Sequence, residues 1–232
     1  MRRLARILGT LMIVAGLGSL GWAVTVWQWQ DPFTAFLTYR SQQSLGSDFD
    51  QRLEEGTRRP APATAIAIRQ ALSRDAVDWR KDSKKGDPVA RLRIPRLGLS
   101  LVVVNGTDTN TLKRGPGRYL GSAMPGEGEL VYVAGHRTTY GAPFSKINEL
   151  KKGDQVFVEL PYGTFEYTIT GHRIVAASKT SELKSRGFEQ LALQACHPRF
   201  FATQRLIAYA KPVAVTPPGD DTATPYEAIA AP

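Results

Sequence analysis

The chain begins with a long apolar segment that contrasts with the sequence after it. Arg2, Arg3 and Arg6 precede a stretch without any charged residue, from Ile7 to Gln30. This stretch is longer than the roughly 20 residues that an α-helix needs to cross a bilayer. The positive charges before it favour the cytoplasmic side. Residues 1–30 are therefore predicted to be a basic cytoplasmic end and a transmembrane anchor, with the following chain outside the cell.

Three tryptophans near the far end of this segment support an anchor. Trp22, Trp27 and Trp29 carry indole rings, which favour the membrane interface. The alternative is a cleaved signal peptide, with an apolar core of about 7–15 residues and a small-residue cleavage site soon after it. Neither feature is clear here, so we expect an uncleaved, single-pass membrane protein.

Residues 31–87 and 216–232 lack the apolar patterning of a folded core. The first segment mixes both charges with few aliphatic clusters and predicts an extracellular stalk or linker, because it buries too little surface to offset the ordering entropy. Ile68, Leu72 and Trp79 lie near a helical repeat, so the linker should be partly helical. Alternatively, this piece packs on the domain as an N-terminal helix. The second segment, with four prolines, predicts a flexible tail.

From residue 88 to residue 215 the pattern changes to short alternating or β-branched runs between turn residues. We predict strands at residues 89–94, 99–104, 130–134, 155–160, 164–175, 188–195 and 205–215. Short helices are expected only near residues 109–113 and 143–150. This pattern predicts an all-β domain over residues 88–215, built as a closed or nearly closed β-barrel of seven or eight strands.

Charge and composition narrow the set of partners. The chain has 232 residues and a formal net charge of +9, which outside a cell suits anionic lipids and wall polymers. Nucleic acid is not an expected partner, because no cluster of lysine and arginine is interleaved with aromatic residues. The cysteine and histidine spacing matches no metal site, and no cofactor is expected.

Cys196 is the only cysteine, so it cannot form a disulfide within the chain. A lone thiol is most useful as a nucleophile, and it needs a base or a cation to act at neutral pH. His197 is its neighbour on a strand and points to the opposite face, and His172 lies inside a predicted strand. His136 follows a strand in a polar loop and is therefore the expected partner.

Arg205 begins the next predicted strand, which we expect to run antiparallel to the one ending in Cys196. Its guanidinium would emerge beside the sulfur, where it can stabilise a thiolate or the oxyanion of a tetrahedral intermediate. An ion pair at the surface is the ordinary alternative.

Three segments around these residues resemble a known family. They read AGHRTTYGAPF at residues 134–144, CHPRF at 196–200 and QRL at 204–206. Over residues 88–215 the chain is similar to the sortase transpeptidases, class E in particular. The resemblance implies a closed eight-stranded barrel, an enzyme anchored on the outer face of a Gram-positive cell, and Cys196, His136 and Arg205 as the catalytic set.

The resemblance also implies the reaction and its partners. A class E sortase cleaves an LAxTG-like sorting signal at the C-terminus of a surface protein, between Thr and Gly. A thioester acyl-enzyme forms, and the protein passes to an amine of a cell-wall precursor. Tyr140 is the candidate residue for shaping the preference for this signal.

One departure from the family pattern concerns the residues before the nucleophile. The usual T-L-x-T-C pattern has alanine at both threonine positions here, Ala192 and Ala195. A threonine at residue 195 would offer a hydroxyl that could bind the sorting peptide, and alanine lacks it. We therefore place Ala195 with Tyr140 among the substrate-binding positions.

Two other functions remain open. A cysteine peptidase with the same residues would release the acyl-enzyme to water, and incorporation of an added amine separates the two. A non-catalytic barrel that binds wall polymers through its positive charge would keep its role without Cys196.

Overall fold

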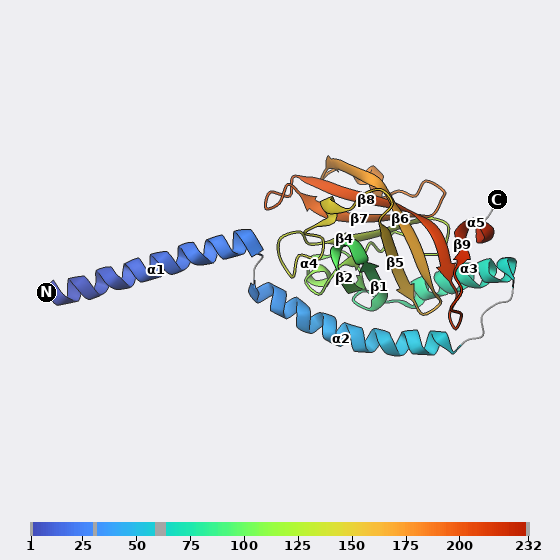
Figure 1. Cartoon of the computed structure of the whole chain (residues 1–232), viewed down its shortest axis with the longest axis horizontal. Coiled ribbons are helices and arrows are strands. Elements are labelled where there is room, and N and C mark those ends of the chain that lie inside the picture. The colour runs from blue at the N-terminus through green and yellow to red at the C-terminus, as the bar shows by residue number, and fades with distance from the viewer. Residues whose placement is uncertain (1, 30–31, 59–63, 231–232) are drawn as a thin grey trace.

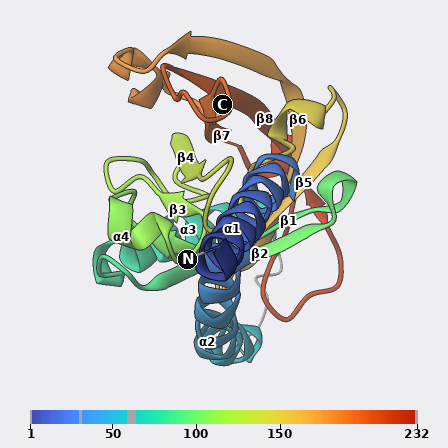
Figure 2. The same ribbon diagram turned by 90° about the vertical axis from the view of Figure 1, so that its left-hand side faces the viewer.

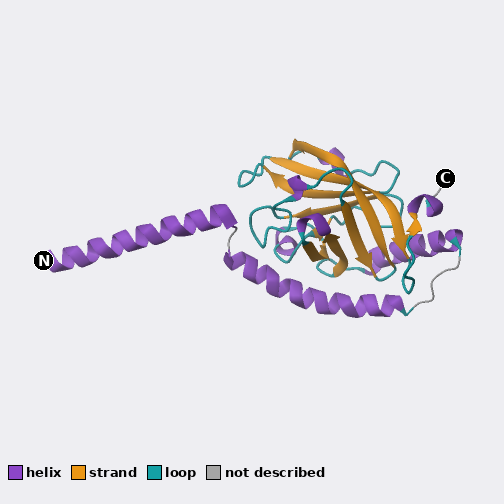
Figure 3. Cartoon of the chain, in the orientation of Figure 1, coloured by secondary structure: helices purple, strands orange, loops and turns teal. Residues whose placement is uncertain are grey.

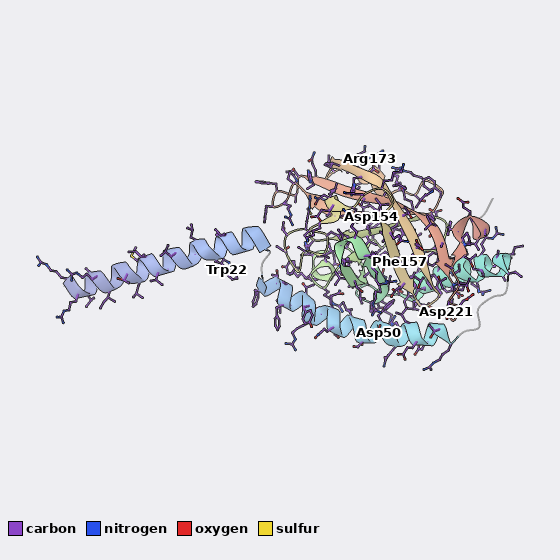
Figure 4. The ribbon with its side chains drawn as sticks, in the orientation of Figure 1. Trp22, Asp50, Asp154, Phe157, Arg173 and Asp221 are labelled. Carbon is purple, nitrogen blue, oxygen red and sulfur yellow. The ribbon has the colours of Figure 1, made fainter. Side chains whose placement is uncertain are left out.

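The computed structural model of the protein describes residues 2–29, 32–58 and 64–230 (Figure 1). Helix α1, Arg2–Trp29, extends away from the rest of the protein. Its stretch from Arg2 to Val24 is long and apolar enough to cross a membrane, and none of its most apolar part is buried in the protein. Trp22 is exposed on this helix (Figure 4). The interfacial placement expected for Trp27 and Trp29 concerns side chains outside the described residues.

Nine strands of the described chain form one sheet that closes on itself (Figure 3). They are β1 Pro88–Ile94, β2 Leu99–Asn105, β3 Gly117–Arg118, β4 Leu130–Gly135, β5 Gln155–Leu160, β6 Gly163–Ala176, β7 Gln190–His197, β8 Gln204–Thr216 and β9 Thr224–Pro225. The order is β6-β5-β1-β2-β3-β4-β7-β8-β9, and β6 also pairs with β8. Strands β1 to β8 therefore make a closed eight-stranded barrel, which confirms the predicted fold, and β9 is an addition at the outside of β8.

Side chains alternate between the barrel interior and its outer face, as the period of a strand requires. On β7, Leu191, Leu193 and Ala195 belong to the main core, whereas Ala192 belongs to a separate cluster on the outer face. This second group, which we call the outer cluster, comprises Leu130, Tyr132, Val175, Ala192, Ile207 and Tyr209. The candidate site lies at one end of this outer face, as the strand register below shows.

Short helical turns join the strands. Helix α4, Thr109–Leu112, is capped at its N-terminus by Asp108. The Asp108 carboxylate accepts hydrogen bonds from the amides of Asn110 and Thr111. The hydrogen bond from the Thr111 hydroxyl contributes most to lowering the pKa of Asp108 to about 2. The other turns are η1 Pro95–Leu97, η2 Ile147–Glu149 and η3 Thr180–Leu183. The helix predicted at residues 143–150 is only the single turn η2, because the backbone bonds there span three residues, as from Ser145 to Ala142.

Helix α2, Pro32–Thr57, packs on the barrel where the sequence predicted a free stalk. It lies below the barrel, on the side of β1 and β2 (Figure 2). Leu45 and Phe49 are buried against Val102 and Val104 of β2. The amide of Gln42 bonds both backbone groups of Val102, at 2.8 and 3.0 Å. Gln42 thus completes the hydrogen bonding of β2 as a neighbouring strand would.

Helix α3, Ala65–Asp82, also covers the barrel. Thr64 caps its N-terminus by accepting from the Ala67 amide. Ile68, Leu72 and Ala76 join the main core. The described part of residues 31–87 is therefore mostly helix packed on the domain, which corresponds to the alternative considered for this segment. Its apolar residues are too few for a core of their own, but they suffice to cover a barrel that already has one.

The C-terminal segment is also folded where the structure describes it, in place of a flexible tail. Strand β9 pairs with β8, and helix α5, Tyr226–Ile229, follows it with Ile229 buried. The Tyr226 hydroxyl donates to the buried carboxylate of Glu189 at 2.9 Å. Tyr167 donates to the same carboxylate at 2.6 Å. Burial raises the pKa of Glu189, and these bonds oppose that rise. Two phenols and a carboxylate hence tie the tail to the barrel.

The packing of α2 generates a stability prediction. Phe49 is 0% exposed, so Phe49→Ala should lower the free energy of unfolding by roughly 3–5 kcal/mol, as large-to-small changes in cores do. Phe36→Ala is the matched control, because Phe36 lies on the same helix and is 56% exposed. It should change stability by less than about 0.5 kcal/mol. Urea unfolding of the detergent-solubilised protein measures both, and equal effects would contradict the packing of α2.

Candidate active site

The register of three neighbouring strands brings Cys196, His136 and Arg205 together. Strands β4 and β7 are parallel, and their pairing ends at Gly135 opposite Ala195. His136 follows Gly135 and Cys196 follows Ala195, so the two residues lie side by side at the end of this pair of strands. Neighbouring strands are about 4.8 Å apart. On the other side of β7, Cys196 pairs directly with Arg205 of β8. The predicted residues thus lie at one barrel end.

Cys196 and Arg205 share the outer face of the barrel. Directly opposite residues of an antiparallel pair project to the same face, and the alternation along β7 and β8 places both in line with Ala192 and Ile207 of the outer cluster. Both are partly exposed. Burial raises the pKa of Tyr132 to about 12, while the positive charge of Arg205 opposes that rise. Arg205 therefore acts electrostatically on this face.

The guanidinium of Arg205 is held by the connection between β7 and β8. Its Nη1 donates to the carbonyls of Ala202 and Gln204, at 2.7 and 2.9 Å. Ala202 has a left-handed backbone with φ of 53°. These bonds restrain the side chain of Arg205, the cross-strand partner of Cys196, against the β7–β8 connection.

His136 is partly buried, and its ring contacts Tyr140. The two ring centroids are 5.0 Å apart and the planes are tilted by 40°. Burial lowers the pKa of His136, which favours a neutral ring at neutral pH. Its Nε2 is buried and has no hydrogen-bond partner among the described residues. Such a nitrogen is suited to exchange a proton with a bound group, because a buried polar atom normally requires a partner.

Arg137 is a site residue that the sequence analysis missed. It is only 7% exposed, and its Nη1 donates to the carbonyl of Cys196 at 3.2 Å. The same nitrogen lies 2.8 Å from Nδ1 of His197, and Nη2 donates to Asn148 at 2.9 Å. Arg137 therefore joins the end of β4 to the end of β7 and to η2. Its place directly after His136 was visible, but the sequence does not show that a charged side chain turns inward there.

The other two histidines have bonds elsewhere. Nδ1 of His197 lies 2.8 Å from Nη1 of Arg137, and it accepts a hydrogen bond there because an arginine only donates. His172 lies on β6, and its Nε2 is 3.0 Å from the carbonyl of Ile147. Both histidines thus have contacts that account for their presence without chemistry at the sulfur.

Ala195 does not occupy the position expected for a substrate-binding residue. It is 0% exposed and belongs to the main core, because alternation on β7 turns it inward when Cys196 faces outward. A peptide at the outer face cannot reach its side chain. A threonine hydroxyl at residue 195 would lie in the barrel interior, and the other departure from the family pattern, Ala192, is the one on the outer face.

The connection between β6 and β7 covers part of the outer cluster through one buried carboxylate. Glu182 of η3 accepts from the Tyr209 hydroxyl at 2.5 Å. It also pairs with Arg173 of β6 (Figure 4) and with Arg186, at 3.2 and 3.1 Å. The bond from Tyr209 contributes most to lowering the pKa of Glu182. Among the described residues, no group of three or more His, Cys, Asp and Glu side chains could hold a metal ion.

The contacts of Arg137 generate a stability prediction. Arg137→Ala removes a donor from the Cys196 carbonyl and from Nδ1 of the half-buried His197 ring, and a buried group left without its partner costs about 1–3 kcal/mol. Asn148 is exposed and can bond water in place of Arg137. We expect the free energy of unfolding to fall by about 1–3 kcal/mol. Arg199→Ala, an exposed arginine in the β7–β8 connection, is the control and should change it by less than about 0.5 kcal/mol. Urea titrations decide, and an unaffected Arg137→Ala protein would show that these bonds contribute no stability.

Comparison with known proteins agrees with this barrel. The family described as Sortase domain matches residues 92–213, just over half of the chain. Sortase D of Bacillus subtilis (strain 168) is 37% identical over 126 residues, which cover 53% of this chain and 62% of that protein. Sortase SrtE1 of Streptomyces coelicolor is 31% identical over 170 residues, 64% of this chain and 48% of that protein. The chain thus spans about half to three fifths of these relatives.

A solved structure extends the comparison to three dimensions. Sortase E from Streptomyces avermitilis matches with a TM-score of 0.52 and 34% identity, over 58% of this chain and 93% of that one. The family match, the closed barrel and the strand ends that carry Cys196, His136 and Arg205 lead to one conclusion: the chain belongs to the sortase family.

Proposed function

We propose that the protein is a membrane-anchored cysteine transpeptidase that cleaves an LAxTG-like sorting signal between Thr and Gly. The acyl group passes through a thioester on Cys196 to an amine of a cell-wall precursor. The observation that carries the proposal is the cross-strand pair of Cys196 and Arg205, next to the parallel strand end that bears His136. In this proposal the three residues act as nucleophile, cation and proton carrier at one end of the outer face, and the strand register supports that assignment.

In the first half of the reaction, the sulfur of Cys196 attacks the carbonyl carbon of the threonine in the signal. The thiol proton passes to His136, whose lowered pKa favours the neutral ring that can accept it. Arg205 stabilises the oxyanion of the tetrahedral intermediate. The bond to glycine then breaks, His136 returns the proton to the departing amine, and the thioester remains.

In the second half, the acceptor amine attacks the thioester carbonyl. His136 takes a proton from this amine as the new peptide bond forms. The sulfur leaves and regains a proton from His136, so the enzyme returns to its starting state. Arg205 again stabilises the oxyanion, because the same carbonyl oxygen carries the charge in both halves.

The class E assignment and the LAxTG signal belong to this proposal. The similarities to SrtE1 and to sortase E support it, while the similarity to Sortase D is comparable. Tyr140 remains our candidate for shaping the signal preference, because its ring lies against His136. Ala195 is withdrawn from that role, because it lies in the core.

We further propose that α1 anchors the protein in the membrane with the barrel outside the cell. The length and apolar character of α1 support an anchor. Arg2, Arg3 and Arg6 precede it and favour the inner side of the membrane. The partners would be surface proteins with a C-terminal sorting signal and the amine of a cell-wall precursor.

The central test uses the full chain in nanodiscs with LAxTG and LPxTG peptides and triglycine as the amine. We expect a peptide–triglycine product, faster from the LAxTG peptide, and a mass adduct on the wild-type protein. Cys196→Ala should give neither, because the chain has no other cysteine. Mass spectrometry measures both products. Hydrolysis without triglycine transfer would replace the transpeptidase with a peptidase, and product formation by Cys196→Ala would refute the nucleophile.

The role of His136 generates a second prediction. His136→Ala should lower kcat/KM by on the order of a hundredfold or more, as loss of a general acid and base does. His172→Ala is the control, because His172 is an exposed histidine whose ring contacts the Ile147 carbonyl and not the sulfur. It should keep activity within about threefold, since a surface or packing change usually costs little. Steady-state kinetics with the LAxTG peptide measures both, and equal losses would remove the special role of His136.

A further inference from the structure

The loop that begins at His136 has a strained backbone conformation. Tyr140, Gly141 and Ala142 all have left-handed backbones, with φ of 53°, 70° and 38°. For residues other than glycine this conformation costs about 1–2 kcal/mol each. Two of the three carry a side chain. Within the loop, the Ala142 amide donates to the Thr139 carbonyl at 2.9 Å and the Phe144 amide donates to the His136 carbonyl at 3.0 Å. Contacts from neighbouring elements add to these bonds in holding the strained conformation.

The first turns of α2 provide that restraint. The amide of Tyr140 donates to the hydroxyl of Thr34 at 3.0 Å. One turn later, the Thr38 hydroxyl donates to the carbonyl of Lys113 at 2.8 Å, and the ammonium of Lys113 lies 5.9 Å from the centre of the Tyr140 ring. Thr38 and Tyr140 also line one small apolar cavity between α2 and the loop, together with Pro143. Tyr140 is thus held at its backbone and at its ring.

Tyr140 in turn packs against the ring of His136, with 5.0 Å between the ring centroids. The Nε2 of His136 has no hydrogen-bond partner among the described residues, so no bond at that atom orients the ring there. The ring orientation therefore depends on packing. A continuous series of contacts therefore runs from Thr34 through Tyr140 to His136. Its first link joins Thr34 and Tyr140, which are 106 residues apart in the sequence.

We propose that Thr34 and Tyr140 are positioning residues, through which helix α2 sets the orientation and burial of the His136 ring. The inference rests on the proposed function, in which His136 carries the proton between sulfur and amine. Helix α2 follows α1 directly in the chain, so the segment next to the anchor becomes part of the active site. Removing the Thr34 hydroxyl should loosen the loop and misplace His136 without disturbing the nucleophile.

The test compares three variants of the full chain in nanodiscs. Thr34→Val keeps the shape of the side chain and removes the hydroxyl, whereas Thr34→Ser keeps the hydroxyl. Thr57→Val is the matched control, because Thr57 lies near the other end of α2 and bonds Glu54 within the same helix. Hydrogen exchange of the Tyr140 amide and NMR titration of the His136 ring, one of three histidines in the chain, are measured for each.

In Thr34→Val we expect the Tyr140 amide to exchange roughly two- to thirteenfold faster, the range that one neutral hydrogen bond supplies. The midpoint of the His136 titration should rise, because burial lowers the pKa of this ring and the loosened loop buries it less. For turnover, kcat should fall by about tenfold with little change in KM. Thr34→Ser and Thr57→Val should behave as the wild type.

Two substitutions at Tyr140 separate positioning from signal recognition. Tyr140→Phe keeps the ring against His136 and should keep kcat. Tyr140→Ala should lower kcat for both LAxTG and LPxTG peptides, whether or not the ratio between them also changes. A change only in the ratio between the two peptides would assign Tyr140 to recognition and overturn its positioning role.

Exchange and titration need no turnover, so the two proposals can fail separately. If the wild type transfers no peptide but the His136 titration differs between the wild type and Thr34→Val, the transpeptidase is refuted and the positioning role is supported. An active wild type with unchanged exchange and unchanged His136 titration in Thr34→Val overturns the positioning role and leaves the transpeptidase intact.

Discussion

The hydrogen-bonded register of β4, β7 and β8 is the constraint on which the candidate site depends. The parallel pairing of Gly135 with Ala195 places the ends of β4 and β7 at one level, and the antiparallel pairing of Cys196 with Arg205 adds the third strand. A shift of one residue would turn Cys196 into the core and Ala195 outward. The buried Leu191 and Leu193 oppose such a shift, because it would expose them. Core packing and the chemistry of the outer face are therefore set by the same bonds.

Around this register, polar side chains inside the protein join segments that are far apart in sequence. Arg137 connects the ends of two strands with η2, and Glu182 ties the β6–β7 connection to Tyr209. Gln42 satisfies the backbone of Val102 in place of a neighbouring strand. Each of these groups is costly to bury alone and acceptable only with its partners present. They make the arrangement of the loops around the barrel specific, which the apolar core alone does not do.

Helices α2 and α3 change how the barrel is connected to the apolar helix α1. A free stalk would let the barrel move independently of α1. Instead, α2 packs along the barrel, and its first described turns contact the loop of His136. The C-terminal segment is likewise attached, through Tyr226 and the buried Glu189. The folded unit thus extends beyond the eight strands, and its added elements cover surfaces that the barrel would otherwise expose to water.

The sequence alone determined the features that repeat locally or stand out chemically. The alternation of apolar and polar residues predicted the β-barrel and most of its strands, and an uncharged run predicted the apolar helix α1. A single cysteine and the family motifs around it pointed to Cys196, His136 and Arg205. Only the tertiary structure decided that α2 packs on β2, that Arg137 is buried, and that Ala195 faces the core. The physical reason is that periodicity reports which side of its own element a residue occupies, whereas burial and hydrogen bonding depend on a partner brought close by the fold. Leu45 and Phe49 are isolated apolar residues in a polar helix until Val102 and Val104 are beside them.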